Sequence, residues 1–141
     1  MKNDFSAFMA ANKIENEEVS YIASKRFKGA DGKPIPWKFH PITAKENRDI
    51  IQSCTKKFIG ATGKQETTTD MVKYQLALIT ACVTYPDLND AGLQDAYHVI
   101  GAEALIETML LPGELTDLFK AISQANGFEN DMAEKIKEAK N

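Results

Sequence analysis

The apolar residues of this chain follow two different periods. Between residues 19 and 42 they alternate with polar residues, which is the period of a β-strand; from 43 to 128 they recur every third or fourth residue, which is the period of a helix. Phe5, Phe8 and Met9 also have helical spacing and predict a short helix over 4–12. The pattern predicts an α+β fold, mainly helical, with an N-terminal β-hairpin at about 19–42.

Two extended runs form the predicted hairpin, residues 19–27 and 35–42, with an Asp-Gly turn signal between them at 31–32. Pro36 and Pro41 lack a backbone N–H. We therefore expect the second strand to be irregular or to lie at the edge of its sheet.

The first long helix is predicted to begin with a capping box, in which Thr43 is the N-cap and Glu46 follows three residues later. One face of this helix holds Ile50, Ile51, Cys54 and Phe58. Residues 60–69 are polar and contain two glycines, so they predict a loop. Asp70 is expected to begin the next helix, where an acidic side chain suits the helix dipole.

That next helix is apolar over most of its circumference, which predicts the buried centre of the domain. Its apolar residues are Met71, Val72, Leu76, Leu78, Ile79, Cys82 and Val83. Tyr85-Pro86 is expected to end it. Two short helices then follow, one from Asn89 or Asp90 to near Gly101 and one that stops at Pro112. Their apolar positions are Leu93, Tyr97 and Ile100 in the first, and Leu105, Ile106, Met109 and Leu110 in the second.

The last predicted helix carries one apolar stripe at the spacing i, i+3, i+4 and i+7. The stripe consists of Leu115, Leu118, Phe119 and Ile122. Gly127 stands where a left-handed residue ends a helix, and Phe128 can fold back on the last turn. The stripe either closes the core or presents part of itself, or a groove beside it, to a partner.

Length and charge narrow the class of protein. The length of 141 residues suits one domain, which we place at residues 1–128, with its helices at about 44–127. We expect residues 129–141 to form a charged tail that is either a frayed helix or partly disordered. The net charge is +4 over residues 1–73 and −7 over residues 74–141. The acidic half disfavours nucleic-acid binding. The N-terminus lacks the apolar core of a signal peptide and no membrane-length apolar run follows, so we expect a cytoplasmic protein.

Candidate chemistry is sparse. The standard nucleotide-binding and hydrolase motifs do not occur, and neither do metal-ligand spacings of Cys and His, so we expect no enzyme activity, no cofactor and no metal. Cys54 and Cys82 are interpreted as buried small apolar residues. His98 is interpreted as a structural residue, and Glu103 and Glu107 as solvated surface. The glycines at 60 and 63 depart from the spacing of a phosphate-binding loop and are interpreted as a flexible connector.

An alternative function depends on residues 36–40, where Trp37, Lys38, Phe39 and His40 combine aromatic and basic side chains. Such side chains can stack on single-stranded bases, which would suit a small regulatory module that binds nucleic acid. The simpler interpretation of the same residues is an apolar seal over the helices.

The order of the segments resembles the XkdN-like family of phage tail assembly chaperones, from tailed phages and prophages of Gram-positive bacteria. The shared features are the aromatic and basic strand at 36–40, the buried helix around 74–76, the acidic stretch at 86–90 and Leu-Pro-Gly-Glu at 111–114. The helix carrying Leu115, Leu118 and Phe119 completes the resemblance, which spans residues 1–128.

The resemblance implies a non-enzymatic chaperone that binds the tape measure protein in the host cytoplasm, keeps it soluble, promotes tail tube assembly and is absent from the mature virion. It also implies contact with the tail tube protein. Helix-in-groove contacts would suit such a partner. The expected partner-binding residues are Glu114, Leu115, Leu118, Phe119 and Ile122.

Many tail chaperone genes also make a longer product by ribosomal frameshifting. The chain ends Ala139-Lys140-Asn141, which the slippery heptamer A AAA AAC would encode if read as GCA-AAA-AAC. We therefore expect a frameshifted longer form as a further partner. A gene that uses AAG for Lys140 would not contain this heptamer.

Overall fold

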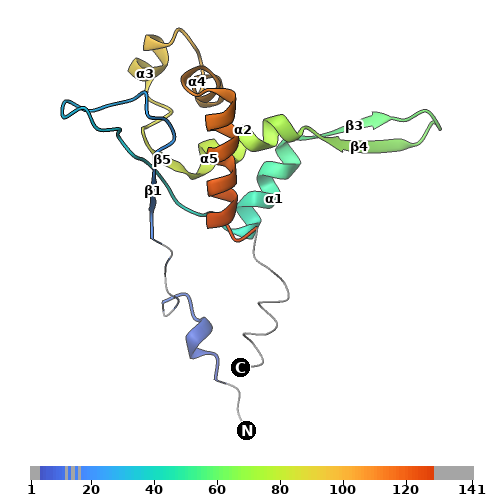
Figure 1. The fold of residues 1–141 in the computed structure, drawn as a ribbon. Coiled ribbons are helices and arrows are strands. Elements are labelled where there is room, and N and C mark those ends of the chain that lie inside the picture. Colours follow the sequence, from blue (N-terminus) through green and yellow to red (C-terminus); the bar gives the residue numbers. More distant parts are fainter. Residues whose placement is uncertain (1–3, 12, 14, 16, 129–141) are drawn as a thin grey trace.

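The structure, a computed structural model, describes residues 4–11, 13, 15 and 17–128. These residues form a small α+β domain with five α-helices and two small sheets (Figure 1). The elements in chain order are η1 (Ser6–Phe8), β1 (Val19–Tyr21), β2 (Trp37–Phe39), α1 (Ala44–Ser53), β3 (Thr55–Ile59), β4 (Gln65–Thr69), α2 (Met71–Cys82), β5 (Val83–Tyr85), α3 (Ala91–Ala96), α4 (Ala102–Met109) and α5 (Pro112–Ala125). Helices hold 43% and strands 17% of the described residues, so helix is the larger share but less than half.

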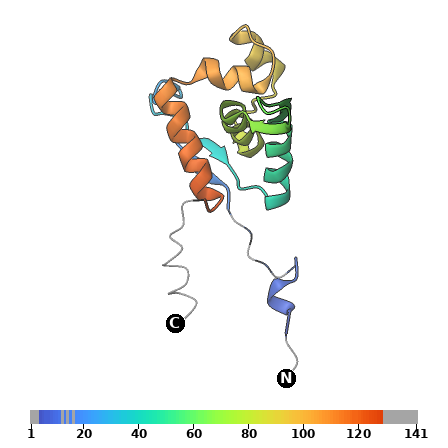
Figure 2. The ribbon, with the colours of Figure 1, turned by 90° about the vertical axis from the view of Figure 1, so that its right-hand side faces the viewer.

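Helix α2 is the centre of the domain, as the sequence predicted. Helices α1, α4 and α5 all pack against it, and α5 and α1 lie on opposite sides of the body (Figure 2). Leu78, Ile79 and Cys82 are completely buried. The prediction was wrong for Met71 and Val72, which are 56% and 66% exposed because they stand in the first turn of α2, at the root of the β3–β4 pair.

The three-stranded sheet has the order β1-β2-β5, with antiparallel neighbours. Residues 19–21 pair with 37–39 as the sequence suggested, but each strand has three residues and the longer runs 19–27 and 35–42 do not form strands. An isolated bridge between Lys28 and Pro34 is the remaining contact of strand type between those runs among the described residues. The hairpin prediction therefore holds only for this short pairing.

The third strand of that sheet, β5, was not predicted. Helix α2 ends at Cys82 rather than at Tyr85-Pro86, and the next three residues pair with β2. The Tyr85-Pro86 peptide bond is cis. A strand of three residues directly after a helix has no periodicity of its own, which is why the pattern missed it.

The second sheet is a two-stranded ribbon of β3 and β4, which projects away from the helices (Figure 1). The prediction of a polar loop at 60–69 holds for the turn at 60–64 and was wrong for residues 65–69, which form β4. Phe58 does not lie on the face of the preceding helix, because α1 ends at Ser53 and Phe58 belongs to β3.

Local capping signals were predicted correctly. The amide of Glu46 donates to Thr43 Oγ1 at 3.1 Å and the amide of Thr43 donates to Glu46 Oε1 at 3.2 Å, which completes the capping box of α1. Asp70 and Asp90 cap α2 and α3 in the same way, by accepting a backbone N–H of the first turn. Each cap satisfies a donor that the helix leaves free.

Helix α5 ends in a Schellman motif. Gly127 has a φ of 85°, and its amide and that of Phe128 donate to the carbonyls of Gln124 and Ser123 at 3.0 Å. The C-cap residue Asn126 accepts the amide of Ile42 at 2.9 Å, which joins the end of α5 to the segment before α1. The glycine stop that the sequence predicted is therefore confirmed.

Three further predictions need correction or fall outside the described part. The helix expected at 4–12 is a single 3-10 turn, Ser6–Phe8, and Asn12 is outside the described residues. Helix α3 ends at Ala96 rather than near Gly101, and Ile100 is 95% exposed. The predicted tail at 129–141, including Ala139-Lys140-Asn141, lies outside the described residues.

Candidate functional site

The apolar stripe of α5 packs mainly into the core. Leu118 and Ile122 are completely buried, and Leu115 and Phe119 are half-buried against the same core. Side chains with no exposed surface cannot reach a partner unless the domain opens. Among the stripe residues, only Leu115 and Phe119 therefore keep surface for a contact, and partner binding by this set of residues stays a prediction.

Glu114, the remaining predicted contact residue, belongs to a polar network at the start of α5. Its Oε1 accepts hydrogen bonds from Arg26 Nη2 and from the amide of Leu111, both at 2.8 Å. Arg26 Nη2 also donates to the carbonyl of Met109 at 2.7 Å, so it closes the end of α4. The hydrogen bond from Arg26, followed by those from Leu111 and Ser24, lowers the pKa of Glu114 from 4.5 to about 2. This network joins the segment after β1 to the α4–α5 junction.

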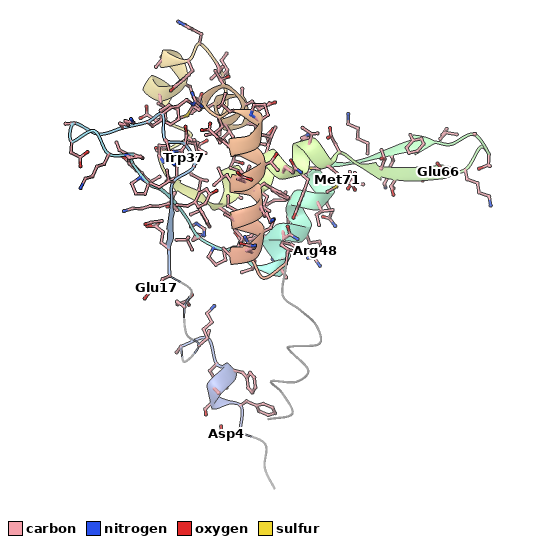
Figure 3. All side chains as sticks on the ribbon, viewed as in Figure 1. Asp4, Glu17, Trp37, Arg48, Glu66 and Met71 are labelled. Carbon is pink, nitrogen blue, oxygen red and sulfur yellow. The ribbon has the colours of Figure 1, made fainter. Side chains whose placement is uncertain are left out.

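An apolar groove lies beside α5, at the side of the body from which the ribbon projects. It has a volume of about 280 Å³. Its lining, which defines the apolar groove below, consists of Asn47, Ile51, Thr69, Met71, Tyr74 and Phe128. Met71 is 56% and Phe128 57% exposed. Figure 3 places Met71 at the root of the ribbon and Arg48 on α1. Exposed apolar side chains that converge on one groove are typical of a protein-binding surface.

The floor of the apolar groove is held by Tyr74. Its hydroxyl donates to Asn47 Oδ1 of α1, and its ring meets the ring of Phe119 edge to face, with centroids 6.3 Å apart. Burial raises the pKa of Tyr74 above 10.0, so the hydroxyl stays protonated and remains a donor. The groove is therefore lined by residues of α1, α2 and β4 and by Phe128, which follows α5, and its floor is held by contacts of Tyr74 with α1 and α5.

The aromatic strand at 36–40 does not present its rings to solvent. Trp37 and Phe39 are 2% and 1% exposed, and Lys38 between them points outward. His40 is half-buried, with Nδ1 2.8 Å from the carbonyl oxygen of Pro41. The structure supports the interpretation of these residues as an apolar seal, and the stacking platform for single-stranded bases is absent from this strand.

The other residues singled out in the sequence lie apart from the groove. Cys54 and Cys82 are buried free thiols, as predicted, and burial raises the pKa of Cys82. Glu103 and Glu107 line a wide, more polar hollow of about 600 Å³ together with the exposed Ile100. His98 is exposed with a φ of 56°. No cluster of three metal-ligating side chains occurs in the described part of the chain, and no helix there is long and apolar enough to cross a bilayer.

Sequence reasoning missed most residues of the apolar groove. Met71 was assigned to the core because its helix is apolar all round, and Ile51 was assigned to a single buried face that continued to Phe58. The available signal was the position of Met71 directly after the cap Asp70, since the first turn of a helix is its least enclosed part. Phe128 was recognised, but only as a residue that folds back on α5.

The chain matches one family model and two bacterial proteins over almost its whole length. The model of the family described as "Phage XkdN-like tail assembly chaperone protein" matches residues 5–140. The phage-like element PBSX protein XkdN of Bacillus subtilis (strain 168) is 29% identical over 140 residues, which cover 98% of this chain and 94% of that protein. The uncharacterized protein YqbN of the same strain is 26% identical over 140 residues, 98% of this chain and 93% of that one.

A solved structure has the same fold. The crystal structure of the protein YqbN superposes with a TM-score of 0.78 at 23% identity, and the match covers 92% of this chain and all of that one.

Proposed function

Because the chain belongs to the XkdN-like family of phage tail assembly chaperones, we propose that it binds the tape measure protein of its phage, keeps that protein soluble and promotes assembly of the tail tube. The role is non-enzymatic. It is exercised in the host cytoplasm before the tail is complete, and the chaperone is absent from the mature virion. The tail tube protein and a frameshifted longer form of this chain are further proposed partners.

The observation that carries this proposal is the apolar groove. A chaperone for a helical protein must cover apolar stripes that would otherwise aggregate, and a groove between helices can receive such a stripe. Ile51 of α1, Met71 of α2 and Phe128, in the turn after α5, converge on a space of about 280 Å³. That space suits one or two large apolar side chains of a helix laid across the opening.

Only part of the apolar stripe of α5 is available for contact with a partner in this proposal. Leu118 and Ile122 stay in the core, and Phe119 supports the floor of the groove through its contact with Tyr74. We propose that the partner helix lies beside α5, against the apolar groove, and that Glu114 and Leu115 contribute only at the N-terminal end of α5.

Co-expression tests the proposal. The tape measure protein encoded in the same phage locus is expressed alone, with the wild-type chain, and with two variants. Met71→Glu places a charge in the apolar groove, whereas Ile100→Glu makes the same charge change at an exposed apolar residue outside it. Loss of one buried anchor costs about 1.5–3 kcal/mol, which is about a 10- to 150-fold loss of affinity.

We expect the wild type and Ile100→Glu to keep the tape measure protein in the soluble fraction and to co-purify with it, and Met71→Glu to fail in both. A tape measure protein that remains insoluble with every version would contradict the function. Equal rescue by both variants would retain the function but contradict the groove as the contact surface.

A further inference from the structure

The β3–β4 ribbon contributes no residue to the hydrophobic core. Neither of its strands pairs with another strand among the described residues, and most of its residues are exposed (Figure 1). An isolated two-stranded hairpin is only marginally stable in water. Phe58 and Ile59 are nevertheless exposed on it, at 44% and 77%. A projecting ribbon with exposed apolar residues and two unpaired edges has the form of a docking element.

The register shows which backbone groups of the ribbon are free. The amide of Gly60 donates to the carbonyl of Lys64, and the amide of Asp70 donates to the carbonyl of Cys54, both at 2.9 Å. Hydrogen-bonded pairs alternate with non-hydrogen-bonded pairs in an antiparallel ladder. Between these two hydrogen-bonded pairs, 60–64 and 54–70, the pairs 56–68 and 58–66 are therefore also hydrogen-bonded. At 57–67 and 59–65 the N–H and C=O groups face away from the partner strand.

The charges of the ribbon distinguish its two edges. Strand β3 carries Lys56 and Lys57, which point to opposite faces because side chains alternate along a strand. Strand β4 carries one charged residue, Glu66. An added strand with acidic side chains would meet a lysine on each face along β3, whereas along β4 it would meet a carboxylate.

We propose that the outer edge of β3 accepts an extended acidic segment of a partner protein as a third strand. The backbone groups of Lys57 and Ile59 make the ladder hydrogen bonds, and Lys56 and Lys57 select for carboxylates. The outer edge of β3 contributes no lining residue to the apolar groove, to which the ribbon gives Thr69 of β4. The edge recognises an extended chain instead of a helix, so it gives the protein a second, chemically different contact.

The test uses the full chain, labelled with ¹⁵N, and a capped peptide of Glu-Glu-Val-Val repeats (the Glu-Val peptide), which presents carboxylates on both faces of an added strand. A capped peptide of Lys-Lys-Val-Val repeats (the Lys-Val peptide) is the control. At a peptide concentration about ten times the dissociation constant, we expect hydrogen exchange of the Lys57 and Ile59 amides to slow about tenfold. The Lys-Val peptide should leave these amides unchanged.

Two proline variants locate the edge. Lys57 and Thr67 are opposite each other in the ribbon, and both N–H groups face away from the partner strand. Lys57→Pro and Thr67→Pro therefore remove no hydrogen bond between β3 and β4. Lys57→Pro should abolish binding of the Glu-Val peptide and Thr67→Pro should preserve it. Lys57→Glu tests the charge while keeping the backbone N–H. This variant should no longer bind the Glu-Val peptide and should bind the Lys-Val peptide.

Several results would overturn the proposal. These are the absence of protection by the Glu-Val peptide, loss of binding in Thr67→Pro but not in Lys57→Pro, and an unchanged preference in Lys57→Glu. Protection of the same amides that increases with protein concentration without peptide would also overturn it, because the ribbon would then pair with a second copy of the chain.

Discussion

The rings of Tyr74 and Phe119 meet edge to face, with centroids 6.3 Å apart and planes at 82°. This contact joins the central helix α2 to α5, and the hydroxyl of Tyr74 joins α2 to Asn47 of α1. One side chain therefore connects three helices and forms the floor of the apolar groove. A groove with a fixed floor loses less conformational entropy when a partner binds than one made of mobile side chains.

Removal of the Tyr74 hydroxyl should weaken the fold without destroying it. Tyr74→Phe keeps the ring contact with Phe119 but leaves Asn47 without this donor. We expect the free energy of unfolding to fall by about 1 kcal/mol, measured by urea denaturation. Tyr85→Phe, at a half-exposed tyrosine, is the matched control and should have no comparable effect.

The raised pKa of Tyr74 gives a prediction at high pH. The folded state holds the phenolic proton more tightly than the unfolded state, for which 10.0 is the ordinary pKa. This stabilisation is fully present below pH 10.0 and is lost as the pH rises through the folded pKa. Urea midpoints of the wild type should fall above that pH. The difference between wild type and Tyr74→Phe should shrink there, and a constant difference would contradict the assignment.

The buried half of the α5 stripe should behave as core. Leu118→Ala removes a side chain with no exposed surface and should lower the free energy of unfolding by about 2–5 kcal/mol. Leu115→Ala, at a half-buried position of the same helix, should cost clearly less. Thermal unfolding of both variants checks this order. Equal and small losses would mean that Leu118 is not enclosed as the structure shows.

Glu114 should contribute to stability in a defined range of pH. Its pKa is lowered to about 2 in the folded state from an ordinary value of 4.5. A lowered pKa means stability that is present above 4.5 and lost as the pH falls through about 2. Glu114→Gln should therefore be less stable than wild type near neutral pH, and the difference should diminish in acid. Urea midpoints across that range test the sign.

The glycine at the end of α5 should tolerate no side chain without cost. Gly127 has a φ of 85°, a region that L-residues with a Cβ avoid. Gly127→Ala should lower the free energy of unfolding by about 1–2 kcal/mol, and Gly127→Asn by less, because asparagine accepts this conformation more readily. Circular dichroism during thermal unfolding would measure both variants.

Local signals in the sequence were sufficient for much of the helical part. The capping box of Thr43 and Glu46 and the helix stop at Gly127 each depend on residues within one or two turns, so spacing alone predicts them. The β3–β4 ribbon was missed for the opposite reason. Its strand Gln65–Thr69 is polar on both faces and lacks the alternation that marks a half-buried strand.

The candidate site was harder to predict because it depends on tertiary packing. Ile51, Met71 and Phe128 are far apart in sequence and meet only when α1, α2 and α5 have packed. The stripe on α5 predicted Leu118 and Ile122 as contact residues, but both side chains are buried in the core. The structure has an apolar groove near the end of that helix, and contact of a partner with the groove or with the stripe residues stays a prediction.

Site-specific photo-cross-linking in cells would show whether the apolar groove receives a helix of the tape measure protein. A photo-reactive amino acid is placed at position 71 in the groove or at position 100 outside it, and the chain is expressed with the tape measure protein. We expect a cross-link to an amphipathic helix of the tape measure protein from position 71 and none from position 100. Cross-links from position 100 alone, or from neither position while the two proteins co-purify, would contradict it.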